Sequence, residues 1–142
     1  MGWNFGDILE AIEPVLPPDA PAFIHGDRVV AWSEASRISN NLARALIARG
    51  AEPGDKLAIY MRNRPEYLLA LSAAFKARLT HVNINYRYTP DEVWYIFDNS
   101  DARVVVYASE FRDAVAQIRP RLPHVLAWVE VTEGGEAASF AE

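Results

Sequence analysis

Two polar segments carry the residue types that could hold an anion or a nucleotide. Segment 61–64 reads Met-Arg-Asn-Arg, and segment 83–88 reads Asn-Ile-Asn-Tyr-Arg-Tyr. Each follows a short run with the composition of a strand, and ligands of open parallel sheets bind beyond the carboxyl ends of the strands. Arginine, asparagine and tyrosine supply hydrogen-bond donors at such an edge. The alternative, which the sequence favours, is that these residues cap the following helices and fix the direction of the chain.

Residues 50–56, Gly-Ala-Glu-Pro-Gly-Asp-Lys, are the nearest approach to a phosphate-binding loop. A P-loop follows a strand, opens a helix and places lysine directly after its second glycine. Here the spacing is one residue short and Asp55 separates Gly54 from Lys56. The segment also follows a predicted helix and opens a predicted strand. We therefore interpret it as a helix stop followed by a turn.

The remaining reactive residue types form no catalytic or metal-binding group. The chain has no cysteine, which excludes disulfides, thiolate zinc sites and a cysteine nucleophile. It has no Gly-x-Ser-x-Gly elbow and no Gly-x-Gly-x-x-Gly fingerprint. His25, His81 and His124 are far apart and have no metal-ligating partner at helical spacing. Solvent-facing or hydrogen-bonded histidines are the expected outcome.

One acidic group stands out, and it comprises Asp91, Glu92, Asp98 and Asp101. The first two lie in Thr89-Pro90-Asp91-Glu92, the strongest helix-start signal in the chain. Threonine caps, proline occupies the first helical position and glutamate closes the capping box. The helix dipole favours acidic residues there, so these carboxylates are interpreted as structural.

The N-terminal part predicts a short helix, a connector, a hairpin and a longer helix. Apolar residues at helical spacing between Phe5 and Ile12 predict the first helix, and the prolines at 14–21 end it. Two apolar runs, 22–25 and 29–32, flank a Gly-Asp turn and predict a β-hairpin. Ser33 is the expected cap of the next helix, which Gly50 ends.

From Lys56 onward, strands and helices alternate. The expected strands are 56–61, 81–85, 103–107 and 125–131. The expected helices are 66–77, a helix that begins at Thr89, and 111–119. The first of these helices has Asn63 as its cap, Glu66 closing the capping box and Pro65 in its first turn. This order predicts an α/β fold with a partial parallel sheet flanked by helices and preceded by the hairpin.

We expect three regions along the 142 residues. Residues 1–21 form the helix and the proline-rich connector, 22–132 form the α/β segment, and 133–142 form a loop or cut terminus. The net charge of −5 disfavours nucleic-acid binding. The N-terminus has no signal-peptide pattern, and the longest apolar stretch, 67–75, suits a buried helix rather than a membrane span.

Several segments, taken in order, resemble the opening of AMP-forming acyl-CoA synthetases, which are adenylate-forming enzymes. The most specific stretch, 74–92, is similar to the actinobacterial fatty-acyl or steroid-acyl CoA ligases. The resemblance runs from about Trp3 to Val131, through 26–28, 32–34, 41–46, 50–58, 63–67 and 74–92.

This resemblance implies the first part of the large domain of an acid–thiol ligase. Such an enzyme uses ATP and Mg²⁺ to convert a carboxylic acid into an acyl-adenylate, and CoA then displaces AMP. The family's phosphate loop, its magnesium and ribose carboxylates and its lid lysine have no matching positions here, so no catalytic, cofactor-binding or metal-binding residue is assigned. We therefore expect the chain alone to be inactive and to bind none of these cofactors.

The resemblance also implies a cytoplasmic enzyme, free or peripherally attached to a membrane, and it allows a homodimer. The remainder of the enzyme is the expected partner. Two alternatives stay open. One is a stand-alone flavodoxin-like binding module without catalysis that uses the strand-end segments. The other is a truncated fragment with an exposed apolar sheet edge or face.

Overall fold

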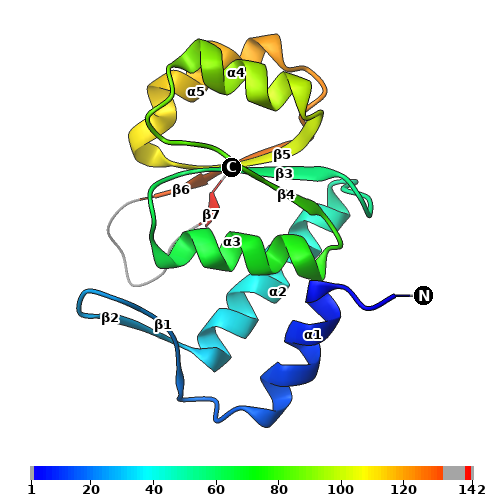
Figure 1. Cartoon of the computed structure of the whole chain (residues 1–142), viewed down its shortest axis with the longest axis vertical. Helices are drawn as coiled ribbons and strands as arrows, with labels where there is room; N and C mark the ends of the chain where they lie inside the picture. Colours follow the sequence, from blue (N-terminus) through cyan, green and yellow to red (C-terminus); the bar gives the residue numbers. More distant parts are fainter. Residues whose placement is uncertain (1, 133–139, 142) are drawn as a thin grey trace.

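Four parallel strands form the centre of the molecule (Figure 1). The computed structural model describes residues 2–132 and 140–141. The sheet runs in the order β4-β3-β5-β6-β7. The four parallel strands are β3 (Lys56–Tyr60), β4 (Thr80–Asn83), β5 (Ala102–Ala108) and β6 (Ala127–Val131). The predicted α/β class and parallel sheet are confirmed.

Strand β5 shows why this segment forms the middle of the sheet. Its run of β-branched residues suits a strand that is buried on both faces. Val104 and Val106 point into one apolar core, while Val105 and Tyr107 point into the other. The strand therefore joins two cores that lie on opposite sides of the sheet.

Helices cover both faces of the sheet. On one side lie α2 (Trp32–Ala48) and α3 (Pro65–Lys76), and on the other lie α4 (Pro90–Asn99) and α5 (Arg112–Ile118) (Figure 1). Short 3-10 turns at Ser109–Phe111 and Arg119–Arg121 flank α5. The helix predicted for 111–119 is thus present, but its ends are tighter turns.

Two predicted helix caps have different outcomes. At α4, the Glu92 amide donates to Thr89 Oγ1 and the Thr89 amide donates to Glu92 Oε2, which confirms the capping box. At α2, the predicted cap Ser33 is wrong, because the helix begins at Trp32 and its N-cap is Ala31, two residues before Ser33. Backbone carbonyls of the connector accept from the first amides of α2 instead: Trp32 N donates to Ala20 O at 2.9 Å and Ser33 N to Pro18 O at 3.1 Å.

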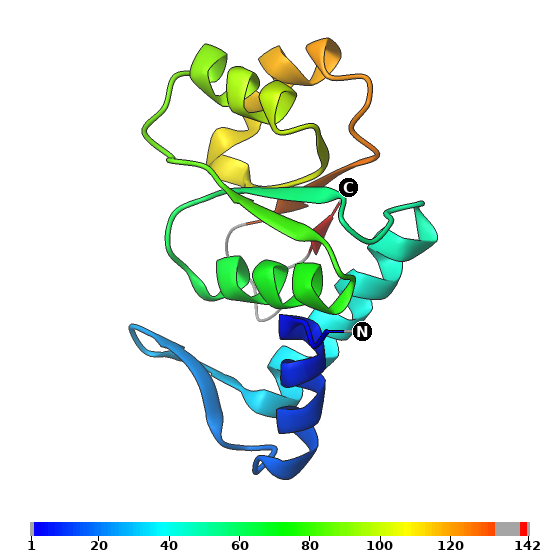
Figure 2. The same ribbon diagram turned by 45° about the vertical axis from the view of Figure 1, so that its right-hand side comes forward.

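The predicted hairpin is confirmed. Strands β1 (Pro21–His25) and β2 (Arg28–Ala31) pair antiparallel, and His25 stands opposite Arg28 across a two-residue loop. Val30 is fully buried against a small apolar core with Ile38 of α2 and Leu69 of α3. Figure 2 shows the hairpin projecting from the α2–α3 side of the molecule.

The N-terminal helix α1 (Phe5–Ile12) packs against α3 and is followed by a 3-10 turn, Glu13–Val15. The Phe5 and Phe75 rings lie 5.0 Å apart. The Lys76 side chain is only 2% exposed, and its ammonium donates to Glu13 Oε1 at 2.7 Å and to Asn40 Oδ1 at 2.9 Å. One buried cation therefore joins α3 to α2 and to the turn after α1.

One strand was not predicted. Strand β7 (Phe140–Ala141) pairs antiparallel with β6 within the stretch expected to be a loop. Two residues are too short to show a strand periodicity, so the pairing depends on the exposed edge of β6. The rest of the expected loop, 133–139 and 142, lies outside the described residues.

The contact between α1 and α3 generates a stability prediction. A Cβ added at Gly6 would lie 2.4 Å from the Phe75 carbonyl oxygen, whereas one added at Gly2 would meet nothing within 4 Å. We predict that Gly6→Ala lowers the free energy of unfolding by about 1–3 kcal/mol, because α1 must move away from α3. Urea denaturation measures this, with Gly2→Ala as the matched control. Equal stabilities for the two variants would contradict the close packing.

Candidate functional site

The two predicted polar segments lie side by side at the carboxyl edge of the sheet. Strands β3 and β4 are parallel neighbours, with Ile59 paired to Asn83, so the segments that follow them leave the sheet together. The Arg62 guanidinium lies 4.5 Å from the centre of the Tyr86 ring. Arg62 Nε also donates to Glu110 Oε2, after β5, at 3.0 Å. The structure therefore joins the ends of three strands at one edge.

A second polar cluster joins α3 to β4. The Tyr67 hydroxyl donates to Asn83 Oδ1 at 2.8 Å and lies 2.9 Å from His81 Nε2. Burial lowers the pKa of His81 and raises the pKa of Tyr67, so both groups are neutral at pH 7. The Tyr67 hydroxyl and His81 Nε2 share a hydrogen bond whose donor is set by the histidine tautomer. His81 is therefore a hydrogen-bonded structural histidine, as expected.

Glu66 is the main departure from the sequence prediction. It closes no capping box with Asn63, because the N-cap of α3 is Arg64 and no side chain caps the helix. The Glu66 side chain is fully buried instead. Arg64 Nε donates to Glu66 Oε2 at 2.6 Å, and Arg28 of β2 donates to Glu66 Oε1. The carboxylate thus points inward, because two arginines compensate its charge there.

These contacts determine the charge state of Glu66. Burial alone raises the pKa of Glu66, but the hydrogen bonds from Arg28 and Arg64 outweigh burial and hold the pKa below its ordinary value. Glu66 is therefore ionised at neutral pH and holds the hairpin against the start of α3. The sequence offers no signal for a pairing across 38 residues, although Arg64 lies only two positions away.

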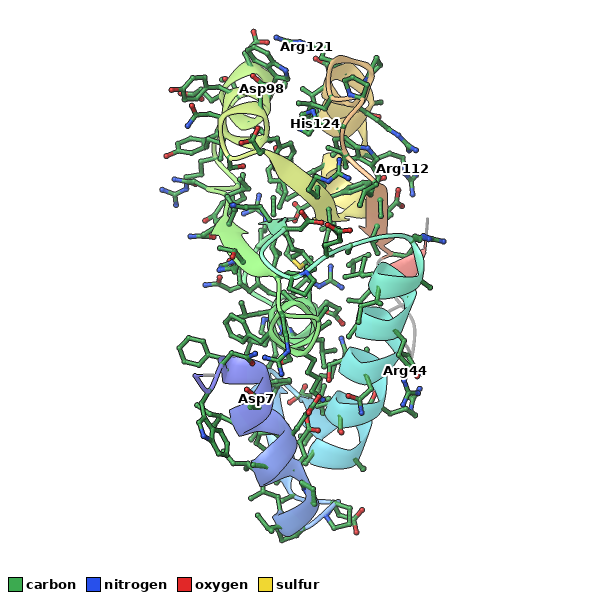
Figure 3. The ribbon with its side chains drawn as sticks, turned by 90° about the vertical axis from the view of Figure 1, so that its right-hand side faces the viewer. Asp7, Arg44, Asp98, Arg112, Arg121 and His124 are labelled. Carbon is green, nitrogen blue, oxygen red and sulfur yellow. The ribbon has the colours of Figure 1, made fainter. Side chains whose placement is uncertain are left out.

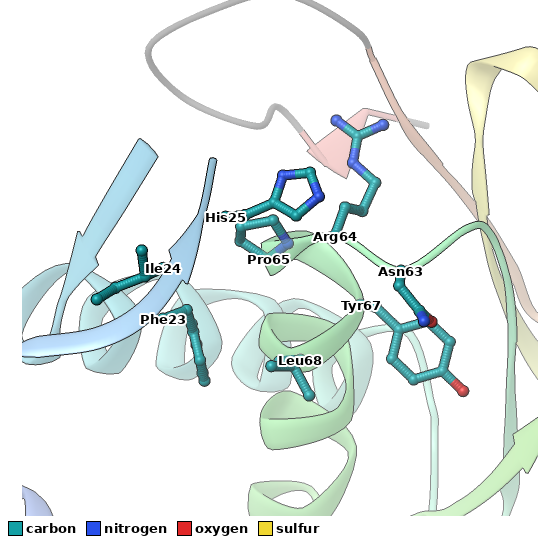
Figure 4. Close-up of a pocket in the computed structure, with 8 residues that line it drawn as sticks. All are labelled: Phe23, Ile24, His25, Asn63, Arg64, Pro65, Tyr67 and Leu68. Carbon is teal, nitrogen blue, oxygen red and sulfur yellow. The ribbon is translucent and has the colours of Figure 1, made fainter. Parts of the chain in front are cut away.

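A shallow pocket lies between the hairpin and the start of α3 (Figure 4). Its volume is about 220 Å³. Its apolar lining comes from β1 and from the first turns of α3, and polar side chains stand at its ends (Figure 4). The lining residues are Phe23, Ile24, His25, Asn63, Arg64, Pro65, Tyr67 and Leu68.

The other sequence candidates have different outcomes, and the expectation for histidines fails at His124, whose Nε2 is buried with no hydrogen-bond partner among the described residues. Gly50 and Gly54 adopt positive φ angles of 95° and 92° in the turn between α2 and β3, so 50–56 follows a helix and precedes a strand, the reverse of the order around a P-loop. Asp91 accepts from Arg121 at 2.8 Å. His124 lies with Arg121 at the α4–α5 end of the molecule, opposite Asp7 and Arg44 (Figure 3).

The carboxyl edge of the sheet is mostly neutralised by its own acids. Arg62 pairs with Glu110, and Arg112 pairs with Glu130, which also accepts from the Tyr107 hydroxyl. No group of three histidine, cysteine, aspartate or glutamate residues that could hold a metal ion occurs within 2–132 and 140–141. The edge offers hydrogen bonds and aromatic surface, but the geometry of the described residues assembles no nucleophile with a base.

Fold and edge together define an α/β segment with a parallel sheet, helices on both faces and polar segments at the carboxyl edge. Residues 14–140 match the family described as AMP-binding enzyme, and the chain belongs to that family. It is 39% identical over 135 residues to the 3-oxocholest-4-en-26-oate–CoA ligase of Rhodococcus rhodochrous. It is 37% identical over 134 residues to a Mycobacterium marinum ligase described for medium- and long-chain fatty acids and for the same steroid acid.

Solved structures agree with this assignment. The fold superposes on an anthranilate–CoA ligase in complex with anthranoyl-AMP, with a TM-score of 0.83 and 28% identity, over 97% of this chain and 26% of that one. The fold also superposes on a Mycobacterium tuberculosis fatty acyl-CoA synthetase, with a TM-score of 0.78 and 26% identity, over 89% of this chain and 26% of that one. The two curated ligases are each matched over 94% of this chain and 24% of their own length. The chain therefore spans about a quarter of its relatives.

The Glu66 contacts predict a loss of stability on neutralisation. Glu66→Gln removes the charge that Arg28 and Arg64 share, and we expect a loss of about 1–3 kcal/mol in the free energy of unfolding. The matched control is Glu52→Gln, which removes one charge from an exposed turn. Thermal and urea denaturation measure both variants. If the Glu66→Gln and Glu52→Gln proteins have the same free energy of unfolding, the pairing of the two arginines with the Glu66 carboxylate does not stabilise the fold.

The same carboxylate predicts a pH dependence. The folded-state pKa of Glu66 lies below its ordinary value. At pH values between these two pKa values, the unfolded chain therefore binds more protons than the folded chain. The stabilisation is complete above about pH 4.3 and is lost as the pH falls through the folded-state pKa. We predict that wild type and Glu66→Gln differ in free energy of unfolding at neutral pH. This difference narrows only as the pH falls through the folded-state pKa of Glu66. Urea titrations across the acid range test this, and a difference that is constant with pH would contradict it.

Proposed function

We propose that this chain is the N-terminal segment of an ATP-dependent, AMP-forming acyl-CoA ligase for a fatty or steroid-type carboxylic acid. The observation that carries the proposal is the match of 94% of the chain, at 39% identity, to a steroid-acid CoA ligase. The proposed reaction has two steps. The acid attacks ATP to give acyl-adenylate and pyrophosphate, and the CoA thiol then displaces AMP.

In this proposal the chain contributes scaffold rather than chemistry. The described residues provide no carboxylate cluster for Mg²⁺. Three arginines at the carboxyl edge, Arg62, Arg64 and Arg112, are paired with Glu110, Glu66 and Glu130. Phosphate transfer needs cations and amides directed at the developing charge. The remainder of the enzyme supplies those groups and the sites for ATP, Mg²⁺ and CoA, and the chain alone is inactive.

Within the parent enzyme, we propose the same three regions as expected from the sequence: 1–21, 22–132 and 133–142. No helix among the described residues is both long and apolar enough to cross a bilayer. We propose a cytoplasmic enzyme, free or peripherally attached to a membrane. The remainder of the polypeptide is its main partner, and a homodimer is compatible with the fold.

A second candidate function rests on the topology of the sheet. In the order β4-β3-β5-β6, the chain first winds from β3 to β4 on one side and then from β5 to β6 on the other. The point between β3 and β5 is therefore a topological switch point, and such points bind ligands in flavodoxin-like folds. A stand-alone binding module would use Arg62, Tyr86 and Glu110 at that point. The internal pairing of these side chains favours the ligase-segment proposal.

Ligand binding by the chain alone separates the two functions. We predict that isothermal titration calorimetry of the 142-residue protein with MgATP or an acyl-adenylate gives no saturable heat. The physical reason is that Arg62, Arg64 and Arg112 at this edge are already paired with glutamates, and no phosphate cradle is present among the described residues. Saturable binding in the micromolar range, weakened by Arg62→Ala, would favour the binding module instead.

A chimera tests the ligase proposal directly. In it, this chain replaces the matching first quarter of the Rhodococcus ligase. We predict that the chimera forms CoA thioesters from a steroid or fatty acid, and that the chain alone forms none. The intact Rhodococcus enzyme is the positive control. A correctly folded chimera without thioester formation would overturn the proposal.

A further inference from the structure

The N-terminal helix α1 carries a row of exposed apolar side chains. Phe5, Ile8, Ile12 and Val15 follow one another at intervals of three and four residues, so they share one side of the helix and of the 3-10 turn after it. Trp3 lies just before the N-cap of the helix. All are exposed, from 39% at Ile12 to 76% at Trp3 and 79% at Val15. We call these residues the α1 stripe.

Contacts with α3 hold the helix so that the stripe faces outward. Gly6, on the buried side of α1, lies in direct contact with the α3 backbone. Arg78 Nη2 donates to Asp7 Oδ1 at 2.8 Å, and the Lys76 ammonium donates to Glu13 Oε1 at 2.7 Å. The helix therefore cannot turn its exposed side inward without breaking both ion pairs. An apolar surface that is fixed in this way indicates an interaction site.

The size and place of the stripe favour a lipid surface over a second protein. A standard protein interface takes roughly 800 Å² from each partner. A fully covered aromatic side chain contributes roughly 150–250 Å², so two aromatic and three partly exposed aliphatic side chains fall short of that area. Helix α1 lies at the end of the molecule opposite α4 and α5 (Figure 2). A bilayer can cover such a peripheral helix without a matching polar rim.

The charges around the stripe indicate which lipids it fits. The stripe has no charged residue, and neither has the segment 14–18 that follows α1. Asp7 and Glu13 are paired within the chain, but Glu10 is exposed and the net charge is −5. An anionic surface therefore repels the protein. Neutral, zwitterionic headgroups fit better, and tryptophan is enriched at the headgroup level of such interfaces.

We propose that the α1 stripe docks the protein on a zwitterionic lipid surface. Helix α1 lies in the plane of that surface with its apolar side inserted by roughly 5–10 Å, and Trp3 stands at the headgroup level. The inference names the surface for the peripheral attachment, and in that respect it rests on the proposed function. Fatty and steroid-type acids enter bilayers because of their apolar bulk. Docking through α1 holds the ligase where these acids collect.

Co-sedimentation with phosphatidylcholine vesicles tests the proposal, on the 142-residue chain and on the chimera, without ATP or CoA. We expect both to bind, and Trp3→Gln with Val15→Gln to weaken binding at least about tenfold, because two apolar side chains no longer insert. The matched control is Ile47→Gln with Tyr95→Gln, which removes exposed apolar side chains from α2 and α4 and should leave binding unchanged. Added phosphatidylglycerol should not strengthen binding.

Four results would overturn the docking. They are vesicle binding by neither protein, binding by the chain but not by a folded chimera, equal binding by the stripe variant, and loss of binding on Ile24→Gln at the hairpin alone. Self-association of the chain that the stripe variant abolishes would also overturn it, because a second copy would then cover α1. Melting temperatures measured without vesicles show that the variants are folded.

Thioester formation is scored separately from vesicle binding. A chimera that forms thioester without binding vesicles overturns the docking and supports the proposed function. A chimera that binds vesicles through the α1 stripe and forms no thioester supports the docking and overturns the proposed function.

Discussion

The four parallel strands can be buried only if helices cover both of their faces, and this requirement organises the chain. Helices α2 and α3 cover one face, and α4 and α5 cover the other. The crossovers that place the helices there also direct every strand end to the same edge. The two polar segments therefore meet at the carboxyl edge as a consequence of the topology, and their meeting alone does not indicate a ligand site.

Three arginines near this edge are neutralised by acids of the same chain. Arg62, Arg64 and Arg112 each pair with a glutamate of the same chain. Of the three glutamates, Glu66 matters most, because it is fully buried and also binds Arg28 of the hairpin. Removing one partner of a buried ion pair costs far more than removing an exposed charge. The Glu66 pairs hold the hairpin against the start of α3, while Arg62–Glu110 and Arg112–Glu130 join the segments around the ends of β3, β5 and β6.

Much of the fold could be predicted because its signals are local. The β-branched run of β5, the Thr89 capping box and the Gly-Asp turn each depend on neighbouring residues. The failures involve partners distant in sequence or supplied by the backbone. Ser33 does not cap α2, because the Pro18 and Ala20 carbonyls accept from the first amides of the helix. Glu66 does not close a capping box, because its carboxylate binds Arg28 instead. At the candidate site, the sequence indicated the two segments but not Glu110 and Glu130, which pair with their arginines only in the folded chain.

In the enzyme that we propose, the chain supplies the scaffold of an acyl-CoA ligase, while the remainder of the polypeptide supplies the chemistry. Acid-dependent exchange of labelled pyrophosphate into ATP tests this most directly, because it reports acyl-adenylate formation without CoA. We expect exchange by the chimera with the Rhodococcus ligase and none by the 142-residue chain under the same conditions. Exchange catalysed by the chain alone, and abolished by substitutions at Arg62 or Arg64, would contradict it.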